Sequence, residues 1–168
     1  MKTPQTTKPP SRTGSEASDD PAQVFAVLTE IHMLHQLSSA GFNKAQDHEL
    51  HMSHFSILNR LLRFGDAKTP QSLASHMNVT RATMTNSLAR LSSAGLIEVR
   101  DNPEDKRSKL VFLTPDGRRA RDSAIARVAP LMTTYAESMK PGELGKLLEL
   151  LRSLHEAMDP EFESDRGY

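Results

Sequence analysis

The sequence predicts a mostly helical protein with one small β-hairpin, and three observations support this fold class. Residues 69–96 have the pattern of two short helices joined by a tight turn. Two short segments rich in Ile, Val, Leu and Phe follow at 97–100 and 109–113, as expected for paired strands. Amphipathic helical patterns occupy residues 24–37 and 144–158, near the two ends of the chain.

The first short helix is predicted to begin at Pro70. Thr69 is its expected N-cap, and proline is favoured at the first helical position because the N–H that it lacks has no partner there. Leu73, Ala74 and Met77 share one face, and Ala74 is small enough for a second helix to cross closely. We expect this face to be buried.

The second short helix is predicted to follow a turn at Asn78, because asparagine tolerates the left-handed backbone that a sharp turn needs. Thr80 is its expected N-cap. Met84, Leu88 and Leu91 recur at helical spacing and should point inward.

The opposite face of this second helix carries short hydroxyl groups, an amide and two guanidinium groups. An ordinary solvated helix surface carries Glu and Lys pairs instead, whereas these groups suit phosphate oxygens and base edges. We therefore predict DNA contacts from Thr80, Arg81, Thr83, Thr85, Asn86 and Arg90.

A polar loop, D-N-P-E-D-K-R-S, separates the two predicted strands. Arg107 is predicted to enter a minor groove of DNA, where the negative potential attracts a guanidinium group. Asp105 should hold Arg107 through a charge-assisted pair, and Lys109 adds a further cation. The alternative is an ordinary surface ion pair in a turn, which contributes little energy. We favour a DNA-binding loop in which Asp105, Arg107 and Lys109 take part.

The remaining helices are predicted from apolar periodicity and from proline and glycine positions. The first should begin near Pro21 and end at Gly41, and a second should carry Phe55, Ile57, Leu58, Leu61 and Leu62. A later helix should run from Pro115 towards Tyr135, and Pro130 is expected to bend or interrupt it. The last helix follows Pro141 and carries an apolar stripe of Leu144, Leu147, Leu148, Leu151, Leu154 and Met158.

The apolar stripes near the two chain ends predict a homodimer. Both stripes lie outside the central region of short helices and strands, and both are strongly apolar on one face. The C-terminal stripe is also wider than one small domain needs at its edge. The alternative is that they pack only on their own domain. A two-fold axis would present two DNA-reading helices to successive major grooves roughly 34 Å apart, which matches a pseudo-palindromic site.

The order of helix, turn, helix, G-L-I, strand, D-x-R-S loop and L-T-x-x-G resembles the MarR family of winged-helix transcription regulators. The matching residues are Leu91, Gly95, Leu96, Asp105, Arg107, Ser108, Leu113, Thr114 and Gly117. The resemblance implies a winged helix-turn-helix core flanked by dimerisation helices, and a repressor that binds an operator as a homodimer and is released by a small ligand. The sequence departs from the family at Asn86 and Ser87, where a basic and an apolar residue are more usual.

The combined pattern predicts five regions. They are a flexible N-terminal arm (1–20), an N-terminal dimerisation helix with its connection (21–48), a winged helix-turn-helix domain (49–116), C-terminal dimerisation helices (117–158) and an acidic tail (159–168).

Histidines form a cluster at positions 48, 51 and 54, near a further pair at 32 and 35. The i, i+3, i+6 spacing is not the i, i+4 pair that zinc prefers, and cysteine is absent, so we predict no metal site. The resemblance places an effector pocket where the first two helices meet. It makes His32, His35, His51 and His54 candidates for an anionic aromatic ligand, and a metal-responsive regulator is the less favoured alternative.

Charge is distributed unevenly, although the formal net charge is zero. Residues 80–128 contain ten Lys and Arg against six acids, whereas residues 137–168 contain four against eight. Such a chain can turn its basic middle toward DNA. An ordinary scatter of surface charge explains these counts equally well, so charge alone decides nothing.

Several classes of protein are disfavoured. The absence of cysteine excludes a disulfide framework and thiol-based sensing. No apolar run approaches the roughly 20 residues of a membrane span, and the first residues lack a signal-peptide core, so we expect a cytoplasmic protein. No nucleophile elbow, phosphate-binding glycine loop or metal-ligand pair predicts an enzyme or a cofactor. A DNA-binding protein of purely architectural function, without sequence preference, is the main alternative to a regulator.

Overall fold

The structure is a computed structural model that describes residues 20–46 and 50–159. The predicted arm and acidic tail fall almost entirely outside these residues, as does His48. The elements in chain order are α1 (Pro21–Ala45), α2 (Met52–Phe64), α3 (Pro70–His76), α4 (Arg81–Ser93), β1 (Ile97–Asp101), β2 (Lys109–Leu113), α5 (Pro115–Glu137) and α6 (Glu143–Met158). The predicted fold class, mostly helical with one hairpin, is confirmed.

The described residues divide into two compact units, with the division between Gly41 and Phe42. Helix α1 continues through Gly41 into the second unit, so the prediction that Gly41 ends the helix was wrong. Within a helix, glycine costs about 1 kcal/mol relative to alanine but does not stop the backbone. Contacts inside the second unit support the last turn of α1, because Phe42 is buried and its ring lies 4.9 Å from that of Phe55.

The side chain of Gln46, directly after α1, is also fixed within the second unit. It is buried, and its Nε2 donates to the carbonyl of Ala124 in α5 at 3.0 Å. The carboxamide oxygen of Asn43 accepts a hydrogen bond from the N–H of Met52 at 2.8 Å. The start of α2 is thereby held against the end of α1.

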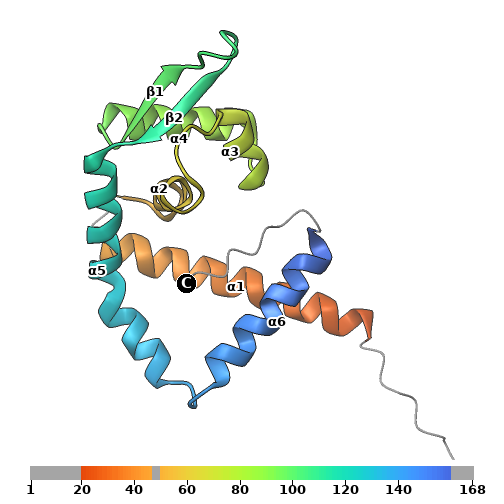
Figure 1. Ribbon diagram of the computed structural model, residues 1–168. Helices are drawn as coiled ribbons and strands as arrows, with labels where there is room; N and C mark the ends of the chain where they lie inside the picture. The colour runs from red at the N-terminus through yellow and green to blue at the C-terminus, as the bar shows by residue number, and fades with distance from the viewer. Residues whose placement is uncertain (1–19, 47–49, 160–168) are drawn as a thin grey trace, which may run out of the picture. The chain divides into compact units, whose positions relative to one another are not determined.

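Helices α2, α3 and α4 enclose the centre of the core, beside the hairpin (Figure 1). Thr69 and Thr80 cap α3 and α4, since each hydroxyl accepts the N–H three residues later at 3.1 Å. Asn78 has a φ of 52°, the left-handed turn that the sequence predicts. The core residues of these three helices are Ile57, Leu58, Leu61, Leu73, Ala74, Met84, Leu88 and Leu91.

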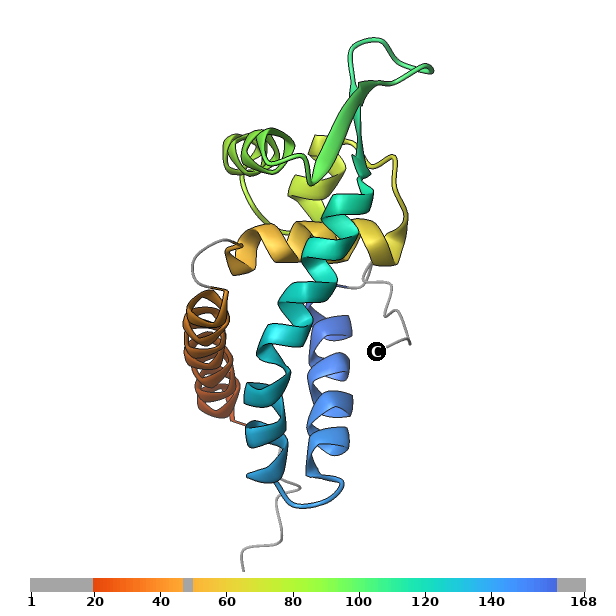
Figure 2. The ribbon, with the colours of Figure 1, turned by 90° about the vertical axis from the view of Figure 1, so that its left-hand side faces the viewer.

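Strands β1 and β2 form an antiparallel hairpin in which Ile97 pairs with Leu113 and Asp101 with Lys109. The base of the hairpin is tied to the connection between α2 and α3. Val111, which is fully buried, exchanges backbone hydrogen bonds with residues 67 and 68, and Asp66 Oδ1 accepts the N–H of Leu113 at 2.8 Å. The far end of the hairpin extends beyond the helices as a free loop (Figure 2).

Helix α5 begins at a tight junction with the end of α4. The hydroxyl of Thr114 donates to the carbonyl of Gly95 at 2.7 Å and accepts the N–H of Gly117 at 3.0 Å. Gly117 is buried, and a Cβ there would lie 2.0 Å from the carbonyl oxygen of Leu96. The L-T-x-x-G pattern therefore has a structural role, because it fixes the direction in which α5 leaves the hairpin.

Pro130 lies inside α5, and the helix continues past it to Glu137 without interruption. The carbonyl that loses its partner belongs to Ala126, four residues earlier. Ala126 and Pro130 are both exposed, so water can bond to the free carbonyl. Of the helices described, none is long and apolar enough to cross a membrane.

Candidate nucleic-acid interface

The outward face of α4 presents all six side chains that the sequence selects for DNA contact. Thr80, Arg81, Thr83, Thr85, Asn86 and Arg90 are exposed, whereas Met84, Leu88 and Leu91 are buried on the opposite face. Within the described residues, the side chains of Arg81 and Asn86 make no hydrogen bond or ion pair. Their donors and acceptors are therefore available to a ligand.

The three threonine hydroxyl groups of this face already bond within the helix. Thr85 Oγ1 donates to the carbonyl of Arg81 at 2.8 Å, and the hydroxyl oxygens of Thr80 and Thr83 lie 2.8 Å apart. Each hydroxyl keeps acceptor capacity for a further partner. They are suited to secondary contacts, and Asn86 and Arg81 to the principal ones.

Asp105 plays a different part from the one predicted. Its Oδ1 accepts the backbone N–H of Arg107 at 3.0 Å, and no ion pair in the described part of the chain joins it to the Arg107 guanidinium. A carboxylate readily reaches the N–H two residues later in a tight turn. The carbonyl of Asp105 also accepts the N–H of Ser108 at 2.9 Å. Asp105 therefore orders the backbone of the loop and leaves the guanidinium of Arg107 exposed.

The other charges of the hairpin are mostly paired. Lys109 forms an ion pair with Asp101, which reduces the charge that it can offer to DNA. Arg100 forms an ion pair of 2.6 Å with Glu98 and lies over the ring of Phe112. The hydrogen bond from Arg100 lowers the pKa of Glu98. Sequence reasoning missed this pair, although the i, i+2 spacing along one face of a strand indicates it.

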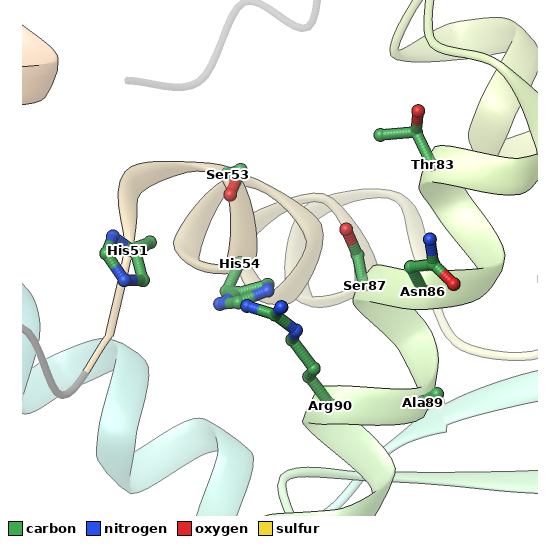
Figure 3. A pocket seen from close by; sticks show the side chains of 8 residues that line it. All are labelled: His51, Ser53, His54, Thr83, Asn86, Ser87, Ala89 and Arg90. Carbon is green, nitrogen blue, oxygen red and sulfur yellow. The ribbon is translucent and has the colours of Figure 1, made fainter.

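An open pocket of about 750 Å³ lies between the start of α2 and the outward face of α4. We call it the histidine pocket and define it by its lining residues, His51, Ser53, His54, Thr83, Asn86, Ser87, Ala89 and Arg90. In Figure 3 the guanidinium group of Arg90 points toward the imidazole of His54. The lining contains no Asp or Glu. The pocket thus joins two of the predicted effector residues to three of the predicted DNA contacts, a connection that the sequence did not reveal.

His54 is half-buried and sits among other basic groups. Burial lowers its pKa, and the nearby charges of His51 and Arg90 lower it further. The rings of His51 and His54 lie 6.0 Å apart, edge to face. The site accumulates positive charge when the imidazoles are protonated.

His32 and His35, the other two effector candidates, are exposed on α1 in the first unit. A ring nitrogen of His32 lies 2.7 Å from Gln36 Nε2, one turn away. Among the residues described, no group of three or more His, Cys, Asp or Glu side chains is arranged to hold a metal ion.

Comparison with known proteins identifies relatives of this chain. Residues 50–109, from just before α2 to the start of β2, match the model of the MarR family. An uncharacterized HTH-type transcriptional regulator of Bacillus subtilis, YdgG, is 27% identical over 99 residues, covering 58% of this chain and 65% of the relative. The HTH-type transcriptional repressor YetL of the same organism is 31% identical over 105 residues, covering 58% and 63%. The matched region spans just under two thirds of each relative.

Solved structures carry the same fold. A mutant MarR from E. coli complexed with operator DNA matches with a TM-score of 0.68 and 26% identity, covering 82% of this chain and 99% of that one. The two Bacillus subtilis relatives are named as HTH-type transcriptional regulators, which agrees with the prediction that the chain is not an enzyme.

Proposed function

We propose that the chain, whose residues 50–109 match the model of the MarR family, is a transcriptional regulator of that family that binds double-stranded operator DNA in a sequence-specific manner. The observation that carries this proposal is the outward face of α4, where Arg81 and Asn86 are exposed beside Thr83 and Arg90. A helix of this width fits a major groove, and its amide and guanidinium groups suit base edges and phosphates.

The hairpin provides a second contact, in a minor groove. Lys106 and Arg107 are exposed at the loop, and neither forms an ion pair within the described residues. The hydrogen bonds of Asp105 and Asn102 hold the loop, so that Arg107 is presented from an ordered turn. Lys109 contributes less than Arg107, because its charge is paired with Asp101.

We further propose that the protein acts as a homodimer on a pseudo-palindromic operator. No residue of α6 is buried in the single chain, and the leucines of its apolar stripe other than Leu154 remain exposed, Leu144 by 47% and Leu147 by 42%. Helix α1 likewise exposes Leu34 by 59% and Leu37 by 64%. Soluble monomers rarely leave apolar stripes of this length in water, so a second copy is the expected cover.

Repression, and release by a small ligand, complete the proposal. One relative, YetL, is named a repressor. An anionic aromatic effector suits the histidine pocket, where His51, His54 and Arg90 offer positive charge without a competing carboxylate. His32 and His35 remain candidate effector residues on α1.

Selection of bound DNA from a random pool tests this function. A regulator should recover a palindromic consensus, which can then be sought upstream of its own and neighbouring genes. An architectural DNA-binding protein, the alternative function, would bind DNA without enriching any sequence. A pool that shows no enrichment in repeated rounds would reject the regulator.

A further inference from the structure

We propose that the histidine pocket holds a backbone phosphate of bound DNA, so that His51, His54 and Arg90 grip the operator and its affinity rises as the pH falls. This inference rests on the proposed function, because it assumes that α4 lies against DNA. It extends the interface from α4 to the start of α2, which no other observation includes in the interface. It also assigns a sequence-independent role to His51 and His54.

The position of the pocket supports this occupant. Thr83, Asn86 and Arg90 belong both to the pocket and to the exposed face of α4. Any duplex that contacts this face must therefore pass over the mouth of the pocket. Figure 3 shows the guanidinium group of Arg90, from α4, beside the imidazole of His54, from α2. Phosphates lie at both edges of a major groove, so one of them reaches the rim of a helix inserted there.

The chemistry of the lining favours an anion. Two imidazoles and a guanidinium group line the pocket, together with the hydroxyls of Ser53 and Thr83 and the amide of Asn86. No carboxylate from either element lines the pocket. Phosphate oxygens accept charge-assisted hydrogen bonds from such donors, and a guanidinium group can bind two of the oxygens at once.

Protonation of His54 is unfavourable while the pocket is empty. His51, which directly precedes α2, and Arg90 from α4 are the charged groups that act on His54, and both lower its pKa, as burial does. A phosphate between these groups would replace repulsion by attraction and would raise the pKa of His54. DNA binding should then be accompanied by proton uptake.

The direction of the pH effect follows from this linkage. Affinity should increase as the pH falls through the pKa of the bound state and should level off below the pKa of the free state. A rise of one pKa unit on binding corresponds to an affinity change of up to about tenfold per protomer. No such change should occur well above neutral pH, where His54 is neutral with and without DNA.

The test is fluorescence anisotropy of DNA binding at constant ionic strength, from about pH 5.5 to about pH 8. Two duplexes are used, the one recovered by selection and one of random sequence. The variant carries His51→Gln together with His54→Gln, because the amide keeps polarity and cannot titrate. The matched control is His76→Gln, a histidine of α3 that is exposed, bonds to the carbonyl of Ser72 and lies outside the pocket.

We expect wild type and the His76→Gln control to bind both duplexes at least about tenfold more tightly at the acidic end of the pH range than at the basic end. The double variant should lose the gain at low pH, so that its affinity changes little between the two ends of the pH range. Because a phosphate contact ignores sequence, the gain should be equal on the two duplexes. Thermal melting of each variant verifies folding.

Three results would overturn the proposal. These are an unchanged pH response in the double variant, no response in wild type, or a response confined to the selected duplex, which would mean a base contact. Failure of the proposed function looks different, since both duplexes would then bind equally well while the histidine-dependent pH response persists. If a free small anion is the true occupant, inorganic phosphate should bind to the protein in the absence of DNA. Added to the DNA-binding measurements, it should then abolish the pH response.

Discussion

Gly117 and the carbonyl of Leu96 approach so closely that a Cβ on Gly117 would lie 2.0 Å from the oxygen. The same Cβ would lie 2.8 Å from Leu113 Cδ1. The contact joins the first turn of α5 to the start of the hairpin. It therefore sets the angle between the DNA-binding elements and the helix that leads to the chain end.

Replacing Gly117 with Ala should destabilise the protein by at least about 1–3 kcal/mol, because a backbone carbonyl cannot move aside as a side chain can. The control is Gly145→Ala in α6, where a Cβ meets nothing within 4 Å. Removal of a helical glycine there should raise stability by up to about 1 kcal/mol. Denaturant unfolding of the two variants gives the comparison. Equal stability of Gly117→Ala and wild type would contradict the contact.

Replacing Asn86 with Ala should relax the preference for one base in each half-site. An amide can bond an adenine edge through both its oxygen and its nitrogen, so the loss should be about 1–3 kcal/mol at that base alone. Binding to a panel of single-base variants of the selected site measures it. The control is Gln23→Ala, an exposed amide on α1. A uniform loss on every sequence would show instead that Asn86 contacts phosphate.

Replacing Arg107 with Ala should leave the fold intact and reduce the salt dependence of DNA binding. The variant has one cation fewer to displace counterions from DNA. The slope of log affinity against log salt should therefore become shallower by about one per protomer. Lys140→Ala, between α5 and α6, is the matched loss of a surface cation and should leave the slope unchanged. An unaltered slope for Arg107→Ala would place this side chain away from DNA.

Replacing Asp105 with Ala should weaken DNA binding, although it removes a negative charge near a polyanion. The carboxylate holds the backbone N–H of Arg107, and without it the loop loses order. Asp101→Ala in the same hairpin is the matched control, since it removes an equal charge and frees Lys109. That control should bind DNA as tightly as wild type or more so. Tighter binding by Asp105→Ala would mean that Asp105 has no ordering role.

Replacing Leu147 and Leu151 together with Glu should dissociate the homodimer, because two charges would enter the apolar stripe of α6. Leu150→Glu is the control, since Leu150 lies off the stripe and is 70% exposed. Size-exclusion chromatography with light scattering gives the masses of both variants. If the double variant retains the wild-type dimer mass, α6 is not part of the interface.

Local signals were sufficient to predict most of the fold. Thr69 and Thr80 each cap the helix that follows, and each cap lies within a few residues of the helical period that it starts. The left-handed turn at Asn78 is equally local. Such features depend on neighbouring residues alone, so a single sequence reveals them.

Features that depend on distant residues were missed or mistaken. Gly41 did not end α1, because the burial of Phe42 against Phe55 outweighs the cost of one glycine. The histidine pocket forms because the start of α2 lies beside α4. The helical periodicity of the sequence does not predict that His54 lies near Arg90. Asp105 accepts a hydrogen bond from a backbone N–H and not from a guanidinium group, and this choice depends on the shape of the turn.

The most direct test of the central claim is competition binding to three duplexes: the selected operator, a random duplex and an altered operator. In the altered operator the half-sites are moved apart by about five base pairs, roughly half a helical turn. A two-fold pair of reading helices should prefer the intact operator to the random duplex by roughly 10³-fold or more. The altered spacing should lose most of that preference, because the half-sites then face opposite sides of the duplex. Equal binding to all three duplexes would contradict a sequence-specific homodimeric regulator.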